Sequence, residues 1–296
     1  MSVEGTVYDL GYAPHEGARL GRSGAIRAIF VDGLRRSLGL RRKARSKVLP
    51  WALIAAAVVP AVALVTVTFY LSGFELETGS PFASHARYFD TIGSLSMLFV
   101  ALITPTLLIP DRRHGVLAIY ASRPVRAVDY LLARSAALAL LASAFILVPQ
   151  TMLYVGIAAL NAEGLWTGLR VNAPEILPTL GTTVGYVVGY CAPAFLVSIY
   201  SRRVAMASGI FVVAMYLSAG LSEVIPGSTD LWAYRAVAPL AWLFHPLTVR
   251  DWLFGLDEAR MPFVQVGLPL WSAALVLLAF AVLTGVLAHR RYRRDL

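Results

Sequence analysis

Long apolar runs separated by short polar segments dominate the pattern of residues along this chain. A helix needs about 20 mostly apolar residues to cross the hydrocarbon layer of a membrane. Apart from Arg134, near one end of the third run, these runs contain no Asp, Glu, Lys or Arg. The pattern predicts an all-α integral membrane protein with six transmembrane helices. The predicted spans are residues 49–72, 91–110, 130–160, 177–200, 204–222 and 266–289.

The composition agrees with this pattern. Charged residues make up 15% of the 296 residues and hydrophobic residues 58%, whereas a soluble domain carries about 25% charged residues. Residues 1–48 are polar and end in a basic cluster, so we expect no cleavable signal peptide. The chain has a single cysteine, Cys191, so it can form no intrachain disulfide. Cys191 lies in an apolar run.

The distribution of basic residues predicts which side of the membrane each loop faces. Six spans place both termini on one side, and 21 of the 26 Lys and Arg residues lie on that side. Loops that face the cytoplasm carry the excess of basic residues. We therefore expect both termini in the cytoplasm and the chain in the cell inner (cytoplasmic) membrane. The formal net charge of +9 then reflects topology, and we expect no nucleic-acid partner.

The chain divides into four predicted parts. Residues 1–22 form a cytoplasmic N-terminal extension, 23–48 an amphipathic connecting helix with a basic flank, 49–289 the six-helix transmembrane domain, and 290–296 a basic cytoplasmic tail. In the second part, apolar residues recur at helical spacing from Ile26 to Leu38. This pattern is typical of a helix in the membrane interface, and an ordinary topogenic flank is the alternative.

The loop between the fifth and sixth predicted spans, residues 223–265, is unusually rich in tryptophan. It contains Trp232, Trp242 and Trp252, and aromatic residues are enriched at membrane interfaces. We expect external short helices here before the last span. They either dip into the outer leaflet or form a folded cap outside it.

The segment DRRHGVLAIYASRPVRAVDY, residues 111–130, is charged although it lies between two apolar runs. Pro110 precedes it, and the residue before a proline is pushed out of helical conformation. We therefore expect the second span to end there. Asp111 follows at a position suited to cap a new helix.

The new helix would have an apolar side formed by Val116, Leu117 and Tyr120. Arg123-Pro124 would then break it before the third span. The pattern predicts a helix, a break and a second helix, parallel to the membrane surface. A plain loop needs only a few arginines, without an apolar face or a placed proline.

This loop, residues 111–129, resembles the first intracellular loop of ABC transporter permeases of the type-2 exporter family. That loop has an acidic and basic start, a glycine, a short leucine-containing helix, a Ser/Arg-Pro-x-Arg break and a final acidic residue. The matching residues here are Asp111, Arg112, Gly115, Leu117, Ser122, Arg123, Pro124, Arg126 and Asp129. By motif the resemblance covers this one loop, and by architecture it covers nearly the whole chain.

The resemblance implies that the loop is a coupling helix, which docks in a groove of a separate ATP-binding subunit. Leu117 and Tyr120 would enter that groove. The basic residues would pair with its acidic rim, where charges set orientation more than affinity. These residues are Arg112, Arg113, Arg123 and Arg126. Each arginine taken singly is equally well explained by topology or by contact with lipid headgroups.

The resemblance also implies an assembly in the lipid bilayer of two permease subunits, identical or related, with two copies of the ATP-binding cassette ATPase subunit. The chain has no G-x-x-x-x-G-K-[ST] phosphate loop and only two lysines, Lys43 and Lys47. Mg-ATP would bind on the partner subunit, and this chain is not an enzyme by itself. The five histidines are scattered, so we expect no cofactor or metal in this chain.

The far N-terminus resembles an extension of some actinobacterial permeases. The matching residues are Tyr12, Pro14, Gly17 and Arg19. We therefore expect a bacterial, actinobacterial source. The extension would lie on the ATPase subunit, or it would be a disordered lead-in.

Polar residues within membrane spans are default candidates for a substrate path. The candidates here are Gln150, Tyr154, Thr183, Tyr186 and Glu223. Each also has a structural explanation, since Gln can bond a neighbouring helix and Thr its own backbone. The shortage of charge in the spans favours a hydrophobic or amphipathic cargo, such as a drug, lipid or natural product.

Two other function classes stay open. A secondary transporter or channel without an ATPase would be expected to have internal repeats or buried ionisable groups in its spans. A membrane-embedded enzyme would need His, Asp or Glu residues that converge at one membrane face. The sequence pattern contains neither feature, and it favours an ATP-driven exporter.

Overall fold

The computed structural model describes residues 21–40, 44–72, 84–121, 125–224, 235–256 and 262–294. Within these ranges the regular elements are all helices, which confirms the predicted all-α class. They are α1 (Gly21–Ser37), α2 (Arg45–Ser72), α3 (His85–Arg113), α4 (Val116–Ala121), α5 (Ala127–Ala159), α6 (Leu165–Asn172), η1 (Ala173–Glu175), α7 (Ile176–Tyr200), α8 (Val204–Val224), η3 (Ala238–Leu240), η4 (Trp242–Phe244), α10 (His245–Phe254), α11 (Pro262–Gln265) and α12 (Trp271–Tyr292).

Five helical stretches in the described part of the chain are long and apolar enough to cross a membrane. They are Lys47–Tyr70, His85–Arg113, Ala127–Ala159, Leu165–Tyr200 and Trp271–Tyr292. The fifth predicted span corresponds to α8, whose described apolar part, Val204–Gly220, is shorter. These lengths support a multi-pass membrane protein, and the count of six spans stays a prediction.

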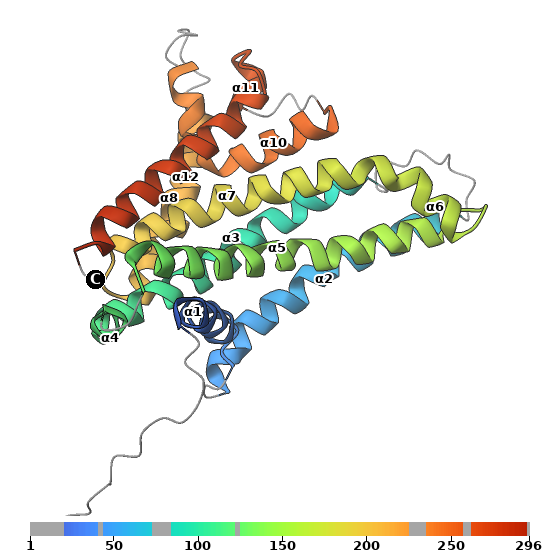
Figure 1. Cartoon of the computed structure of the whole chain (residues 1–296). Coiled ribbons are helices and arrows are strands. Elements are labelled where there is room, and N and C mark those ends of the chain that lie inside the picture. The colour runs from blue at the N-terminus through green and yellow to red at the C-terminus, as the bar shows by residue number, and fades with distance from the viewer. Residues whose placement is uncertain are drawn as a thin grey trace, which may run out of the picture.

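Helices α3 and α7 form the centre of the bundle, and both are largely buried. The Tyr186 hydroxyl in α7 donates a hydrogen bond to the carbonyl oxygen of Phe89 in α3, at 2.9 Å. Helix α2 lies at one edge of the bundle and α12 at the opposite edge (Figure 1). Most of the apolar surface of α2 is exposed, as expected for a helix that faces lipid.

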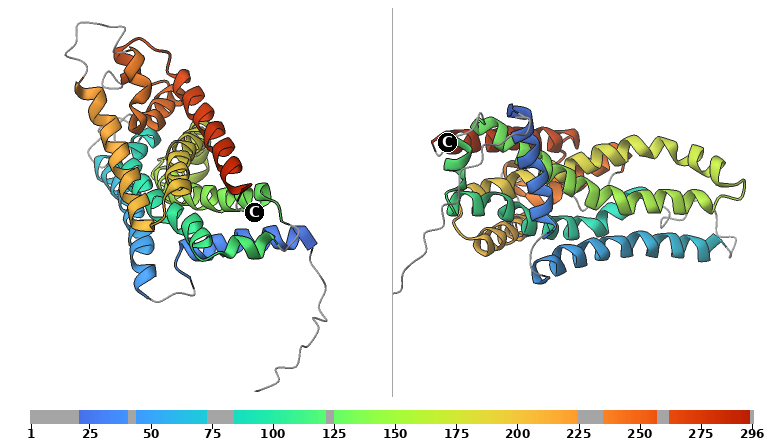
Figure 2. Two further views of the ribbon diagram at one scale, coloured as in Figure 1. Left: turned by 90° about the vertical axis from the view of Figure 1, so that its left-hand side faces the viewer. Right: turned by 60° about the horizontal axis from the view of Figure 1, so that its bottom comes forward.

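Helix α1 lies across the long helices and packs against α5 and α3 (Figure 2). It is found at the end of the bundle where α4 and the last turn of α12 also lie (Figure 1). We call this end the α4 end. The helix predicted within 23–48 is therefore present as α1, while its role as a connecting helix stays a prediction.

The described parts of segment 223–265 contain helices, and α10 packs within the bundle against α7, α12 and α3. Helix α7 presents three glycines to α10 at a spacing of four residues. A methyl group at Gly181, Gly185 or Gly189 would lie 2.7 Å, 3.0 Å or 2.8 Å from a side chain of α10. Small residues at this spacing let two helix backbones approach closely. The stripe explains how α10 fits against α7.

We predict that Gly189→Ala loosens α10 from α7. The added methyl group would clash with the Pro246 ring, and overpacking typically costs about 1–3 kcal/mol. Alanine at Gly209 meets no atom within 4 Å, so Gly209→Ala gains helix propensity of about 0.5–1 kcal/mol. Thermal unfolding in detergent should show a lower midpoint for the first variant only. Equal midpoints for the two variants would contradict the close packing of α10.

Candidate functional site

The turn between α3 and α4 differs from the sequence prediction. Helix α3 continues through Pro110 and Asp111 to Arg113, so the prediction that Pro110 ends the span and Asp111 caps a new helix was wrong. The backbone breaks at Gly115, which has a φ of 67°, a left-handed conformation that glycine adopts without steric cost. Pro110 has no backbone N–H, so the helix loses one hydrogen-bond donor at this position. The carbonyl oxygen of Pro110 still accepts a hydrogen bond from the backbone N–H of His114, at 3.0 Å.

Asp111 and Arg134 form a buried ion pair at the α4 end. Their exposed fractions are 1% and 0%. The Arg134 guanidinium donates to Asp111 Oδ2 at 2.7 Å and to Asp32 Oδ2 at 2.9 Å. It also donates to the carbonyl oxygen of Ile29 at 3.1 Å. One arginine of α5 therefore contacts both α3 and α1.

Two further side chains complete this cluster. The Tyr130 hydroxyl donates to Asp111 Oδ2 at 2.9 Å, and Arg36 donates to both Asp111 and Asp32. The formal charges of the two carboxylates and two guanidinium groups balance. We call this cluster the Asp111 network, and its members are Asp32, Arg36, Asp111, Tyr130 and Arg134.

Gly33 allows α1 to approach α5 closely enough for these bonds. A methyl group at this position would lie 3.0 Å from Ala137 Cβ and 3.2 Å from Arg134 Nη1. The side chain of Ile29, one turn earlier, is buried. The amphipathic face of α1 is thus packed onto the bundle by both apolar contact and the Asp111 network.

A second ion pair fixes the other end of α1. Arg22 donates from Nη2 and Nε to the two carboxylate oxygens of Asp129, at 2.6 Å and 2.9 Å. Asp129 also accepts from the backbone N–H of Arg126 at 2.9 Å, which caps the start of α5. These contacts with the carboxylate raise the pKa of Arg22. Asp129 therefore ties α1 to α5 and is not directed to solvent.

Arg112 bonds the end of α7. Its guanidinium donates to the carbonyl oxygens of Ser198, Ile199 and Ser201, the last at 2.8 Å. The last four carbonyl groups of a helix lack partners within it and carry partial negative charge. Arg112 satisfies several of them, so α3 and α7 are locked together beside α4. This role differs from the predicted pairing of Arg112 with a partner's rim.

The apolar side of α4 faces its own chain. Leu117 is 4% exposed, and the Tyr120 ring is half-buried with its centroid 5.8 Å from that of Tyr130. In the described structure both side chains therefore contact their own chain, and their contact with a partner stays a prediction. Ile119 is the outward apolar residue of α4, with an exposed fraction of 59%. Its neighbours Arg113 and Ala118 are exposed as well.

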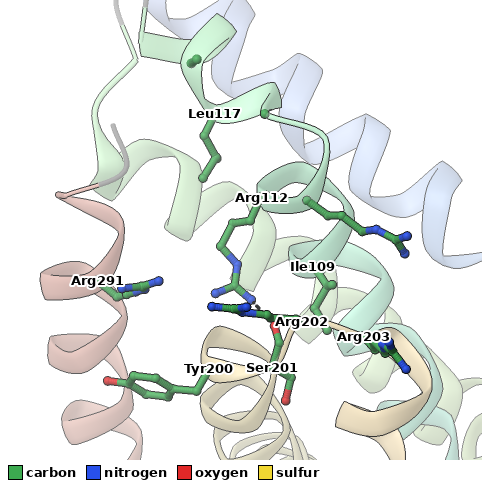
Figure 3. A pocket seen from close by; sticks show the side chains of 11 residues that line it. Ile109, Arg112, Leu117, Tyr200, Ser201, Arg202, Arg203 and Arg291 are labelled. Carbon is green, nitrogen blue, oxygen red and sulfur yellow. Dashed lines mark hydrogen bonds between the residues drawn. The ribbon is translucent and has the colours of Figure 1, made fainter.

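A cavity of about 720 Å³ opens beside α4 (Figure 3). It lies where the end of α3, the segment between α7 and α8, and the end of α12 meet. Ile109 and Leu117 form part of its wall, together with five arginines. The arginines are Arg112, Arg113, Arg202, Arg203 and Arg291. We call this cavity the arginine pocket.

Several predicted residues are not covered by this geometry. Arg126 is exposed at the start of α5, outside the Asp111 network. Glu223 lies in α8, and only its place in that helix is described. The remaining predicted residues lie outside the described residues. They are Tyr12, Pro14, Gly17, Arg19, Ser122, Arg123, Pro124 and Trp232.

The predicted path residues bond within the chain. Gln150 Nε2 lies 3.3 Å from His85 Nδ1, and Tyr154 donates to the carbonyl oxygen of Leu169 at 2.7 Å. Thr183 donates to the carbonyl oxygen of Thr179 at 2.8 Å. Tyr186 bonds α3 as described above.

Two of these four residues lie close together. Gln150 and Tyr154 both lie beside His85, whose ring centroid is 5.4 Å from that of Tyr154. Thr183 and Tyr186 lie on α7 and face other partners. The structure therefore brings the first two together around a histidine that the sequence analysis did not select.

A second buried ionic cluster, at the opposite end of the bundle, was also missed. Arg250 of α10 is 0% exposed and donates to Asp251 Oδ1 at 2.7 Å. It also bonds Asp90 of α3. The sequence analysis placed Arg250 in the external loop 223–265 and began the second span directly after Asp90. It gave no local signal for this contact.

No protein-family model matches this chain, and no curated protein matches it. The function is therefore inferred from the residues and their arrangement.

We predict that Arg134→Met lowers stability strongly. It removes one of the two charged partners of the buried Asp111, and breaking a buried ion pair typically costs about 3–5 kcal/mol. The exposed Arg35 on α1 provides a matched control, and Arg35→Met should change stability by less than about 0.5 kcal/mol. Chemical unfolding of the two variants in the same detergent measures the difference.

The double variant Asp111→Asn/Arg134→Met tests the pairing itself. Removal of both charges should cost less than the sum of the two single changes, because the partners interact directly. Additive costs would show that Asp111 and Arg134 do not stabilise each other.

Proposed function

We propose that this chain is the permease subunit of an ATP-binding cassette exporter. It would pair with a second permease, identical or related, and with two separate ATP-binding subunits that carry Mg-ATP. Its cargo would be a hydrophobic or amphipathic molecule such as a drug, lipid or natural product. The observation that carries the proposal is the Asp111 network, because it makes the surroundings of α4 a single stiff unit.

A lever needs a rigid attachment at both of its ends. Helix α4 follows α3 after the turn at Gly115 and precedes α5 in the chain. Asp111, four residues before Gly115, is bonded to Arg134 of α5. A push on α4 would therefore act on α3 and α5 together, and not bend one loop.

The push would spread further through two other contacts. Arg112 bonds the end of α7, so α7 would follow α3. Arg36 and Asp32 attach α1 to the same network. In this proposal, closure of the ATP-binding subunits on α4 tilts α3, α5 and α7 as a group.

The docking surface in this proposal differs from the one expected from the sequence. Ile119 would contact the ATP-binding subunit, with exposed Arg113 and His114 beside it. Leu117 and Tyr120 would instead pack α4 against its own chain. Interfaces combine a central apolar contact with a polar rim, and this face of α4 has both.

A secondary transporter without an ATPase is the second candidate function. The observation that favours it is the buried His85 of α3, whose Nε2 lies 3.9 Å from a carboxylate oxygen of Glu175. Buried ionisable groups in membrane proteins mark proton or ion pathways. Three results together would support this candidate over the first. Transport would follow a proton gradient, it would be unaffected by ATP, and it would be lost in His85→Gln.

We predict that Ile119→Asp uncouples transport from ATP. The change places a charge in the centre of the proposed contact, where hot-spot substitutions cost at least about 2 kcal/mol, or roughly 30-fold in affinity. The chain would be co-expressed with an ATP-binding cassette subunit from the same source organism. Recovery of the complex and ATP-dependent uptake into inverted vesicles would be measured.

Leu40→Asp is the matched control, since Leu40 is also an exposed apolar residue at the α4 end and lies just after α1. It should leave both measurements within about twofold. Full transport by Ile119→Asp, or transport that needs no ATP-binding subunit, would contradict the proposed function.

A further inference from the structure

The arginine pocket concentrates positive charge. Five guanidinium groups line it, and they are positively charged at physiological pH. Its described lining residues include no Asp or Glu. Asp111, which precedes Arg112 in the sequence, is buried and bonded to Arg134, Arg36 and Tyr130. The positive potential therefore favours an anion in the pocket.

The pocket is built from segments that are far apart in the sequence. Arg112 and Arg113 end α3, Arg202 and Arg203 connect α7 to α8, and Arg291 lies in the last turn of α12. Figure 3 labels four of the five, Arg112, Arg202, Arg203 and Arg291, among the side chains that line the pocket. Arg112 is held in place by the carbonyl groups of α7. One side of the pocket is thus fixed before any ligand binds, which lowers the entropy cost of binding.

The walls of the pocket are also partly apolar. Ile109 and Leu117 line it, and Tyr200 adds an exposed ring. Along α12, the exposed side chains of Leu283 and Val286 begin about 8 Å from Arg291. The arginines therefore lie where the apolar surface of the helices ends. A ligand that fits both features has an anionic group joined to an apolar tail.

We propose that the arginine pocket binds the phosphate-bearing headgroup of an anionic phospholipid. Arginine binds phosphate oxygens through two parallel N–H donors, and basic pockets between transmembrane helices bind such headgroups. The acyl chains would lie along the apolar surface of α12. This site depends on the membrane location of the chain and not on the proposed partner ATPase.

Lipid retention by the purified full chain tests this proposal. The chain would be equilibrated with mixed micelles of phosphatidylglycerol and phosphatidylcholine, and native mass spectrometry would count the lipids that stay bound. Wild type should retain phosphatidylglycerol in preference to phosphatidylcholine. In Arg202→Gln/Arg203→Gln this preference should fall about fivefold for each arginine removed.

The matched control removes the same charge outside the pocket. Arg35→Gln/Arg290→Gln takes away two exposed arginines of the α4 end, and it should keep the wild-type preference within about twofold. Arg291→Gln is a second pocket variant on a different helix, so a folding defect in the loop variant would not decide the outcome. Arg291→Gln should lower the preference about fivefold.

Three results would overturn the proposal. The first is an equal loss in the pocket and control variants, which would indicate only general surface charge. The second is displacement of phosphatidylglycerol by millimolar inorganic phosphate, which would indicate a site for soluble anions. The third is unchanged lipid retention in both pocket variants with loss of the ATP-binding subunit, which would assign the pocket to an acidic partner protein.

Discussion

The burial of one carboxylate, Asp111, constrains the whole α4 end of this protein. A carboxylate removed from water is costly unless charged partners and hydrogen bonds surround it. Asp111 obtains these from three side chains, Arg36, Tyr130 and Arg134, on two other helices. The three helices must therefore stay in register, since a shift of any one would leave a buried charge without its partner. Helix α4 begins shortly after the end of α3 that these bonds hold.

A second buried ionic cluster lies at the opposite end of the bundle. There Arg250 of α10 is buried and bonded to Asp90 and Asp251. Between the two clusters the helices meet mostly through apolar side chains and glycines. Apolar contacts of this kind are non-directional, whereas ion pairs fix orientation. Motion of the bundle is therefore expected in its apolar middle, with each end moving as a unit.

The parts of the fold that could be predicted are those with local patterns. Apolar runs predicted the long helices, and the spacing of Ile26, Ile29 and their neighbours predicted α1. The outcome at Pro110 could not be predicted, because Asp111 after it is bonded to residues that are distant in the sequence. Periodicity identified the apolar side of α4 correctly, but it did not indicate that this side packs on the same chain.

The ionic clusters lay beyond sequence reasoning for a simple reason. Arg134 and Asp32 are 102 residues apart, and Arg250 and Asp90 are 160 residues apart. No local pattern encodes contacts at that separation, and charged residues near span ends are equally well explained by topology. The spacing of the glycines at 181, 185 and 189 indicates a packing surface on α7. It does not indicate that α10 is the helix that packs there.

Hydrogen–deuterium exchange in α1 tests most directly whether the Asp111 network holds the α4 end together. Exchange would be followed in the backbone amides of Gly21–Ser37 in detergent, for wild type, Arg134→Met and Arg35→Met. We predict that α1 exchanges about tenfold faster in Arg134→Met, because it loses the bonds from Arg134 to Asp32 and to the carbonyl oxygen of Ile29, while Arg35→Met matches wild type. Equal protection of α1 in all three proteins would contradict it.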